Sequence, residues 1–263
     1  MTVGFIGTGN MGGALAKAAA KTQCELFLSD KSADKAEALA KDLCAKAVTV
    51  AEAALCDYVF LGVKPQMLAD LLKELAPVLA LRKTPGTLVS MAAGVAMADI
   101  QAMLGMDYPI IRIMPNTPVA VGSGVILYDT TEQVSLEATA GFVSILSQAG
   151  LLNRLPEALI DAGSALSGCG PAFVAMFAEA LADGAVACGL PRDKAMTYAA
   201  QTMLGTAKLL LETGQHPGQL KDAVCSPGGS TIAGVKALEE SAFRGAVMSA
   251  VQNAFVRTKE LGK

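Results

Sequence analysis

The sequence predicts two domains, an α/β domain built on a doubly wound parallel sheet and, after it, a domain made of helices alone. The chain has 263 residues, which is enough for two domains that each bury a core of their own. In the first half, continuous Val/Ile/Leu runs alternate with helical segments, as in a sheet covered by helices on both faces. Beyond Pro156 nearly every segment has a helical pattern. We therefore expect domains at residues 1–160 and 161–263.

The first half contains the strands. Buried strands are expected at residues 2–7, 24–30, 46–50, 57–63, 87–91, 109–114 and 124–129. Helices are expected from the turn after the first strand to about residue 21, from Ser32 to about residue 43, and at residues 66–79. Ser32 is a favourable N-cap, because its hydroxyl can accept a hydrogen bond from a free backbone N–H of the first helical turn.

The second half contains only helices. They are expected at residues 171–189, 191–213, 217–224, 231–239 and 241–261, separated by turns that contain Gly and Pro. Faces rich in Ala and Gly on the first two of these helices suit close contact between helices. We therefore expect the helices after residue 160 to form the interface of a homodimer, or of a larger assembly.

Composition narrows the classes of function. Hydrophobic residues make up 52% of the chain and charged residues 17%, which excludes a disordered protein and predicts extensive burial, including at a subunit interface. The formal net charge is −3 and the chain has no Lys/Arg cluster. A chain of this charge is a poor partner for nucleic acid or for an anionic membrane.

Cysteine and histidine usage argues against a disulfide framework and against a metal site. The six cysteines stand far apart in the sequence, and the single histidine is His216. We expect reduced, mostly buried thiols and no bound metal. The first residues read as a strand rather than a signal peptide, and no uncharged apolar run reaches the roughly 18 residues of a membrane helix. These features predict a cytoplasmic protein.

A Gly-rich motif follows the first strand and opens the first helix. Its residues are Gly7, Thr8, Gly9, Asn10, Met11 and Gly12. In this pattern the first Gly permits a tight turn, the second lets the backbone approach a pyrophosphate, and the third allows close packing of helix and strand. Free N–H groups at the start of the helix can then bind phosphate. The motif in this context predicts dinucleotide binding.

The end of the second strand bears on the choice between NAD and NADP. Asp30 stands where an acidic side chain accepts hydrogen bonds from the adenosine ribose, which favours NAD. Lys31 and Ser32 follow at once and could hold a 2′-phosphate, which favours NADP. A capped turn into the next helix would also explain Ser32 without any ligand. The pattern is compatible with use of both cofactors.

Three further segments follow strands, at the sheet edge where ligands bind in open α/β folds. They contain Val63, Lys64 and Pro65, then Ala92 and Ala93, then Asn116. The small alanines would let a flat ring lie against the backbone, and Asn116 offers an amide between two prolines. Each segment could also be ordinary turn chemistry, since Pro, Gly and Asn are common in turns. Because all three lie at one edge, we expect them to contact the cofactor.

A loop near the chain end, CSPGGSTIAG at residues 225–234, is small, polar and free of charge. By itself it could be a plain turn between two helices. Together with FIGTGNMG, LGVKPQ, SMAAG, RIMPNTP, LSGCGPAF and HPGQLKD, it makes the chain resemble the pyrroline-5-carboxylate reductase family along nearly its whole length. The resemblance implies a Rossmann-like domain that binds NADPH (NADH is possible) and a helical dimerisation domain. It also implies the reduction of 1-pyrroline-5-carboxylate to L-proline, and an assembly that is often a decamer of five dimers.

The resemblance also assigns roles within this loop. It implies that the substrate carboxylate is bound by Ser226 and by the backbone of Gly228, Gly229, Ser230 and Thr231, and that Thr231 faces the ring nitrogen. These roles agree with elementary chemistry. A turn before a helix presents unpaired N–H groups to a small anion, whereas a Lys or Arg there would repel a protonated imine. Thr231 is therefore the candidate catalytic residue, as a hydrogen-bond partner of the nitrogen.

Two alternatives remain at the level of sequence. One is another two-domain NAD(P)-dependent reductase such as a 3-hydroxyacid dehydrogenase, which relies on a Lys in its helical domain. The expected helix at residues 171–189 contains no Lys. The other is a dinucleotide-binding regulator without catalysis, which would have no need of a loop that binds a carboxylate.

Overall fold

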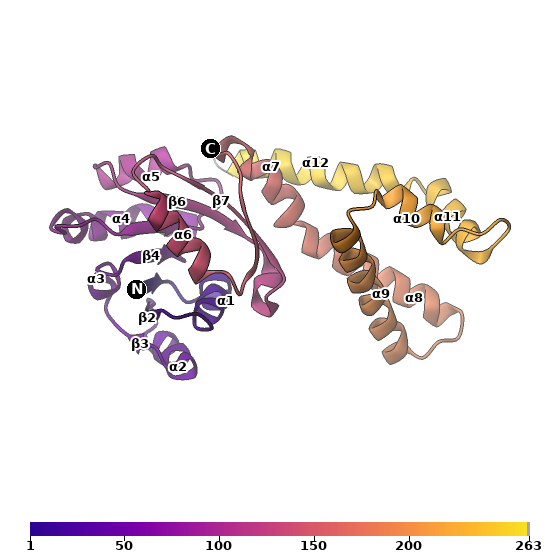
Figure 1. The fold of residues 1–263 in the computed structure, drawn as a ribbon, viewed down its shortest axis with the longest axis horizontal. Coiled ribbons are helices and arrows are strands. Elements are labelled where there is room, and N and C mark those ends of the chain that lie inside the picture. Colours follow the sequence, from indigo (N-terminus) through magenta and orange to yellow (C-terminus); the bar gives the residue numbers. More distant parts are fainter. Residues whose placement is uncertain (262–263) are drawn as a thin grey trace. The chain divides into compact units, whose positions relative to one another are not determined.

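The structure is a computed structural model that describes residues 1–261. The chain divides into two compact units (Figure 1). The first, here called the α/β unit, comprises Met1–Cys169 together with the residues from Ala254 onward, and the second, the helical unit, comprises Gly170–Asn253.

The α/β unit is built on one eight-stranded sheet with the strand order β3-β2-β1-β4-β5-β6-β7-β8. The strands are β1 (Thr2–Ile6), β2 (Glu25–Ser29), β3 (Lys46–Ala47), β4 (Tyr58–Leu61), β5 (Thr87–Ser90), β6 (Ile110–Pro115), β7 (Gly124–Thr130) and β8 (Gly150–Arg154). The helices are α1 (Asn10–Ala19), α2 (Ala33–Leu43), α3 (Val50–Ala53), α4 (Pro65–Ala80), α5 (Met97–Leu104), η1 (Thr117–Val121), α6 (Leu136–Ile145) and α7 (Glu157–Ser167). The chain thus alternates strand and helix, as the sequence predicts.

The sheet differs from the expected all-parallel arrangement at β7 and β8, which run opposite to the other six strands. β7 pairs with β6 in antiparallel register, for example Ile113 with Tyr128, while the other neighbours are parallel. The reason is the connection. Only the short η1 segment joins β6 to β7, and a parallel partner needs a crossover of about a dozen residues or more.

The expected strand at residues 46–50 is shorter in the structure, because β3 ends at Ala47 and α3 follows. Thr49 caps this helix: its hydroxyl accepts a hydrogen bond from the Glu52 amide at 3.2 Å, and the Glu52 carboxylate accepts one from the Thr49 amide at 2.8 Å. This reciprocal cap is a recognised sequence pattern, Thr-x-x-Glu, so the helix start was present in the sequence.

Two cores cover the two faces of the sheet. On one face Phe5 and Phe60 stack with ring centroids 4.5 Å apart, among side chains that include Leu15 of α1 and Phe142 of α6. The other face carries a separate cluster with α4 and α5, for example Leu72. Successive residues of a strand point to opposite faces, so the apolar runs of β1 and β4 supply both cores.

The helical unit contains α8 (Gly170–Ala187), α9 (Arg192–Thr213), α10 (Pro217–Ala223), α11 (Ser230–Glu240) and the first part of α12 (Phe243–Leu261). Its one buried cluster consists of three alanines, Ala182, Ala195 and Ala199. A groove of about 590 Å³ runs along α8 and α12 and is lined by apolar side chains, including Phe177 and Phe243. Most large apolar side chains of this unit are therefore exposed in the single chain.

One helical stretch in the described residues, Glu157–Ala187, is long and apolar enough to cross a membrane by length and composition, and 11% of its apolar window is buried. This differs from the expectation that the chain holds no such segment. That expectation required a run without charge, whereas this stretch includes Asp161 and Glu179. Length and composition of this kind are shared by a helix whose apolar face is covered by another protein chain.

Candidate functional site

The Gly-rich turn after β1 has the close contacts that require glycine. Gly7 has a positive φ of +98°, and a Cβ atom there would lie 2.7 Å from the backbone of Gly62. A Cβ on Gly12 would clash with the carbonyl oxygen of Gly7. A Cβ on Gly9, in contrast, would meet nothing within 4 Å. The turn is therefore packed tightly on the protein side and open at Gly9.

The start of α1 leaves backbone donors at this opening. Gly9 is the N-cap and no side chain caps the helix, so the N–H groups of Asn10, Met11 and Gly12 precede the first bond of the turn, from Gly13 N to Gly9 O at 2.7 Å. Unpaired N–H groups and the helix dipole favour an anion at this position. The residues thus fit a dinucleotide, with open space at Gly9 for the pyrophosphate.

A cavity of about 840 Å³ adjoins this opening, where the sheet order reverses between β1 and β4. Ligands bind at such a point in open α/β sheets. Six of the predicted cofactor residues line the cavity: Gly7, Gly9, Asp30, Lys31, Val63 and Lys64. Ser32 also lines it, as does Gln66, which belongs to the same strand-end segment as Val63, Lys64 and Pro65. The other lining residues were not predicted as cofactor contacts: Ile6, Lys35, Val50, Gly62, Met67, Asp70, Leu71 and Glu74. Gly62 follows a strand and could have been found from that context; the α4 side chains could not, because they reach the cavity through packing.

Asp30 fastens the Gly-rich turn to the end of β2. Its Oδ2 accepts hydrogen bonds from the Thr8 amide at 2.7 Å and the Thr8 hydroxyl at 3.0 Å, and its Oδ1 accepts one from the Ser32 amide at 3.0 Å. Burial raises the pKa of Asp30, but these hydrogen bonds and the charge of Lys35 together hold the pKa below its usual value. Asp30 is therefore an anionic acceptor whose bonds within the chain orient it.

Eight predicted cofactor residues do not line the cavity; apart from Asn116, they lie in four places. Thr8 bonds to Asp30, and Asn10, Met11 and Gly12 form the first turn of α1. Pro65 is the first residue of α4, with Lys64 as its N-cap. Ala92 and Ala93 lie in the loop between β5 and α5, Ala92 buried and Ala93 exposed.

Asn116 uses its side chain within the chain. Its Oδ1 accepts a hydrogen bond from the Val125 amide at 2.8 Å, and its Nδ2 donates one to the Ser167 carbonyl at 2.9 Å. The side chain is buried, with 7% of the residue exposed. It joins the start of β7 to the end of α7, so the predicted cofactor contact of Asn116 stays a prediction, and its observed bonds are structural.

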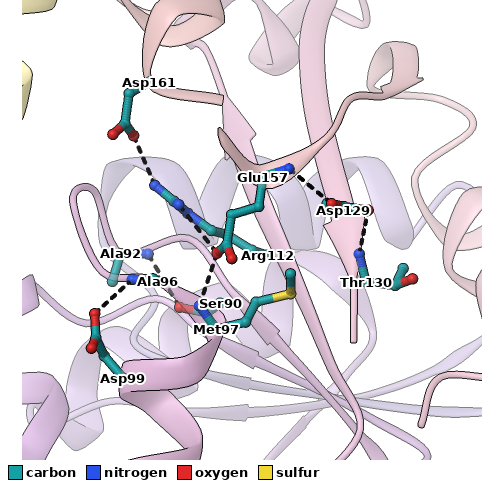
Figure 2. A network of polar contacts seen from close by, with 10 residues as sticks. All are labelled: Ser90, Ala92, Ala96, Met97, Asp99, Arg112, Asp129, Thr130, Glu157 and Asp161. Carbon is teal, nitrogen blue, oxygen red and sulfur yellow. Dashed lines mark hydrogen bonds and ion pairs between the residues drawn. The ribbon is translucent and has the colours of Figure 1, made fainter. Parts of the chain in front are cut away.

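A partly buried ion-pair network lies beside the Ala92 loop (Figure 2). Arg112 on β6 is 4% exposed at its side chain, and its guanidinium contacts the carboxylates of Glu157 at 3.2 Å and Asp161 at 2.9 Å. The Glu157 carboxylate also accepts a hydrogen bond from the Met97 amide at 2.8 Å, and the Glu157 amide donates to Asp129 at 2.8 Å. No local sequence pattern indicates this network, because its members come from four separate segments.

The uncharged loop of the helical unit is a tight turn followed by a helix. The Gly229 amide donates to the Ser226 carbonyl at 3.0 Å across Pro227 and Gly228, and Gly228 has a φ of +68°, as a type II turn requires. Gly229 is the N-cap of α11, and no side chain caps that helix. The amides of Ser230 and Thr231 therefore stand in an uncapped first turn that suits a small anion.

The single histidine has a structural contact. His216 is the N-cap of α10, and its Nδ1 accepts a hydrogen bond from the Gly218 amide at 3.1 Å. This interaction accounts for its place between a loop and a helix start without any role in chemistry.

Comparison with known proteins finds relatives over the whole chain. Residues 157–261 match the family described as pyrroline-5-carboxylate reductase dimerisation, and residues 2–94 match the family described as NADP oxidoreductase, coenzyme F420-dependent. The chain is 39% identical over 267 residues to pyrroline-5-carboxylate reductase of Escherichia coli (strain K12), covering 99% of this chain and 98% of the relative. It is 40% identical over 270 residues to the enzyme of that name from Methanosarcina acetivorans, with coverage of 99% and 98%.

A solved structure has the same fold along its full length. The crystal structure of Plasmodium falciparum pyrroline carboxylate reductase with NADP bound matches with a TM-score of 0.87 and 30% identity. The match covers 100% of this chain and 98% of that one.

Proposed function

The chain belongs to the pyrroline-5-carboxylate reductase family, and on this basis we propose that it reduces 1-pyrroline-5-carboxylate to L-proline with NAD(P)H, the last step of proline biosynthesis. The observation that carries the proposal is the likeness along the whole chain, which includes both the dinucleotide cavity and the uncharged loop before α11. A 3-hydroxyacid dehydrogenase and a non-catalytic dinucleotide-binding protein are the alternatives that this likeness disfavours.

The α/β unit binds the cofactor, NADPH or NADH. Gly7, Thr8, Gly9 and the first turn of α1 hold the pyrophosphate, because the turn is open at Gly9 and the helix donates free N–H groups there. Asp30 and Lys31 line the cavity and bind the adenosine ribose or its phosphate. The strand ends farther along the same sheet edge contact the nicotinamide half of the cofactor. Their residues are Val63, Lys64, Pro65, Ala92, Ala93 and Asn116. When bound, the cofactor supplies the hydride that is added to the imine carbon.

The loop before α11 binds the substrate carboxylate. Ser226 offers a hydroxyl, and Gly228, Gly229, Ser230 and Thr231 offer a tight turn and uncapped amides. None of these residues carries a charge. Neutral donors bind a carboxylate without repelling a positive charge on the neighbouring ring nitrogen.

Thr231 orients the ring nitrogen by a hydrogen bond. Its hydroxyl donates to a neutral imine nitrogen and accepts from a protonated one. The nitrogen gains one proton in the reaction, and a substrate that binds as the protonated imine brings that proton with it. A hydroxyl does not lose its proton readily, so we assign Thr231 an orienting role and no role as a strong acid. Correct orientation of reacting groups contributes several kcal/mol to catalysis.

The helical unit carries the self-association of the chain, since residues 157–261 match a dimerisation family. Its exposed apolar groove supports a homodimer as the smallest assembly, and we propose a decamer of five dimers as the larger one. We assign residues 1–160 to the Rossmann-like cofactor domain and residues 161–263 to dimerisation and substrate binding. The proposed location is the cytoplasm, with neither nucleic acid nor membrane as a partner.

A spectrophotometric assay tests the function. Purified protein is mixed with NADPH or NADH and 1-pyrroline-5-carboxylate, and the loss of reduced cofactor is followed together with the appearance of proline. Turnover with this substrate and none with 3-hydroxyacids and NAD(P)⁺ is the expected result. Binding of NADPH without turnover of either substrate would support the non-catalytic alternative, and oxidation of a 3-hydroxyacid would support the other.

A further inference from the structure

The loop between β5 and α5, residues 91–96, has few bonds of its own. The Ala92 amide donates to the Ser90 hydroxyl at 3.4 Å, the Val95 amide to the Ala92 carbonyl at 3.5 Å, and the Ala96 amide to Asp99 at 3.3 Å. Each of these is long for a hydrogen bond, whose usual N···O distance is about 2.9–3.0 Å. The loop is therefore held only loosely by residues near it in sequence.

The short bond at the end of this loop comes from a distant residue. The Met97 amide, the first of α5, donates to Oε1 of Glu157 at 2.8 Å. The residue before it, Ala96, has no side chain that could cap the helix, so Glu157 takes the place of an N-cap. A carboxylate at a helix start is favoured both by the hydrogen bond and by the helix dipole.

Glu157 is itself held from two sides (Figure 2). Its Oε1 also accepts a bond from Arg112 Nη1 at 3.2 Å, and its own amide donates to Asp129 at 2.8 Å. Arg112 lies on the buried strand β6, where its guanidinium is further fixed by Asp161. Hydrogen bonds in which both partners are ionised are stronger than neutral ones. The position of the Glu157 carboxylate is thus set by the sheet.

We propose that Glu157 is a positioning residue for the reduction: held by Arg112, it fixes the end of the Ala92–Ala93 loop so that the loop can receive the nicotinamide ring. The inference rests on the proposed function, which assigns that loop to the cofactor. Glu157 also opens α7 and the region that matches the dimerisation family, so one carboxylate joins the start of that region to the cofactor loop.

Three variants distinguish a role of Glu157 in positioning the loop from a role in the stability of the fold alone. Glu157→Ala removes the acceptor of the Met97 amide, whereas Glu157→Gln keeps an oxygen acceptor and loses the ion pair. Asp161→Asn is the matched control, because Asp161 pairs with the same guanidinium, is equally accessible at 26% against 27%, and has no bond to the loop. Each variant is made in the full chain and checked for an unchanged oligomer by sedimentation.

Two measurements are compared across the variants. Hydrogen–deuterium exchange of residues 91–97 without cofactor should rise about tenfold in Glu157→Ala and less than threefold in Glu157→Gln and Asp161→Asn. In turnover with NADPH, Glu157→Ala should lose about tenfold in kcat with its NADPH dissociation constant within twofold of the wild type. Glu157→Gln should recover kcat to within about threefold.

The inference is overturned if Glu157→Ala leaves both exchange and kcat at wild-type values. It is also overturned if Asp161→Asn lowers kcat as much as Glu157→Ala does while exchange of residues 91–97 stays at the wild-type rate, since the loss of kcat would then not depend on the bond from Glu157 to the loop. A wild-type protein that does not reduce 1-pyrroline-5-carboxylate would refute the proposed function, while the exchange measurement would still test the role of Glu157 in the loop.

Discussion

The two units bury their apolar side chains to very different extents. In the α/β unit large side chains such as Phe5, Phe60 and Phe142 are fully buried, and they belong to clusters on both faces of the sheet. In the helical unit only alanines are buried, while Met176 is 69% and Leu204 is 60% exposed. The α/β unit therefore has a hydrophobic core. The helical unit contains enough large apolar side chains to form one, but leaves most of them exposed.

The difference shows where each unit obtains its stability. Full burial of a large apolar side chain contributes about 1.5–3 kcal/mol, and the α/β unit gains this within a single chain. The helical unit buries little within the single chain, and its match to a dimerisation family indicates that it associates with another copy of the chain. Changes in the α/β unit should therefore act on cofactor binding independently of protein concentration, and changes in the helical groove should act through assembly.

The largest effect is expected from a charge in the apolar groove. Met176 lines the groove and is mostly exposed, so Met176→Asp removes little packing within the chain. An unpaired carboxylate buried in a dimer interface is strongly disfavoured, and we expect a monomer at micromolar concentration with at least a hundredfold loss of activity. Sedimentation velocity and turnover measure both. The control is Leu81→Asp, on an α/β-unit side chain that is 86% exposed, which should behave as wild type. A dimeric, active Met176→Asp variant would place the interface elsewhere.

Substitutions at two glycines of the cofactor turn should distinguish an effect on stability from an effect on NADPH binding. A Cβ on Gly12 clashes with the Gly7 carbonyl oxygen, so Gly12→Ala should lose about 1–3 kcal/mol of stability as well as NADPH affinity. A Cβ on Gly9 meets no protein atom, so Gly9→Ala should keep the melting temperature and still bind NADPH at least tenfold more weakly. Thermal unfolding and NADPH fluorescence titration test the pair. If Gly9→Ala binds NADPH as tightly as the wild type, the pyrophosphate does not bind at this turn.

Thr231 should affect chemistry without affecting assembly. Thr231→Ala leaves the turn, the glycines and the backbone amides of α11 in place and removes one hydroxyl. A hydrogen bond to a charged partner is worth roughly 1.5–3 kcal/mol, so kcat/KM should fall about 10- to 100-fold. Thr231→Val should behave alike, with an unchanged NADPH affinity and an intact dimer. If both variants keep activity within about twofold of wild type, Thr231 does not contact the reacting atoms.

Lys31 should distinguish the two cofactors. It lines the cavity beside Asp30, and if it binds the 2′-phosphate, Lys31→Ala should raise the KM for NADPH and leave that for NADH nearly unchanged. Lys31 is exposed, so the expected rise is roughly two- to fivefold. Steady-state kinetics with each cofactor decide the matter. Equal effects on both cofactors would mean that Lys31 is only part of a solvated turn.

The smallest effect concerns pH. Burial raises the pKa of Asp30, but the hydrogen bonds from Ser32 and Thr8 together hold the pKa below its ordinary value of 3.8. A lowered folded-state pKa stabilises the fold above the unfolded value, and this stabilisation is lost as the pH falls through the folded value. Asp30→Asn should therefore be less stable than wild type at pH 7, with the difference shrinking below about pH 4. Urea unfolding at several pH values tests this, and a difference independent of pH would contradict it.

The sequence was sufficient for features that depend on neighbours along the chain. Alternation of strands and helices follows from local hydrophobic patterns, and the bounds of the five helices expected after residue 170 agree with the structure to within about two residues. The strand β8 and the helix α7 were not among the expected elements. The Gly-rich turn was identifiable because the spacing of Gly7, Gly9 and Gly12 is itself the requirement. The predicted site residues are more uneven, because six line one cavity while Asn116 is bonded to Val125 and Ser167.

The tertiary structure decided the contacts between segments that lie far apart in the chain. No local pattern pairs Glu157 with Met97 or places Gly62 against Gly7, because each contact exists only once the sheet has brought the segments together. The antiparallel β7 follows from the short connection through η1, whose consequence appears only in the assembled sheet. The amino-acid sequence by itself determined the two kinds of domain and the residues of the turns. Folding decided which polar groups of those turns remain free for a ligand, because a hydrogen bond between distant residues depends on their position in space.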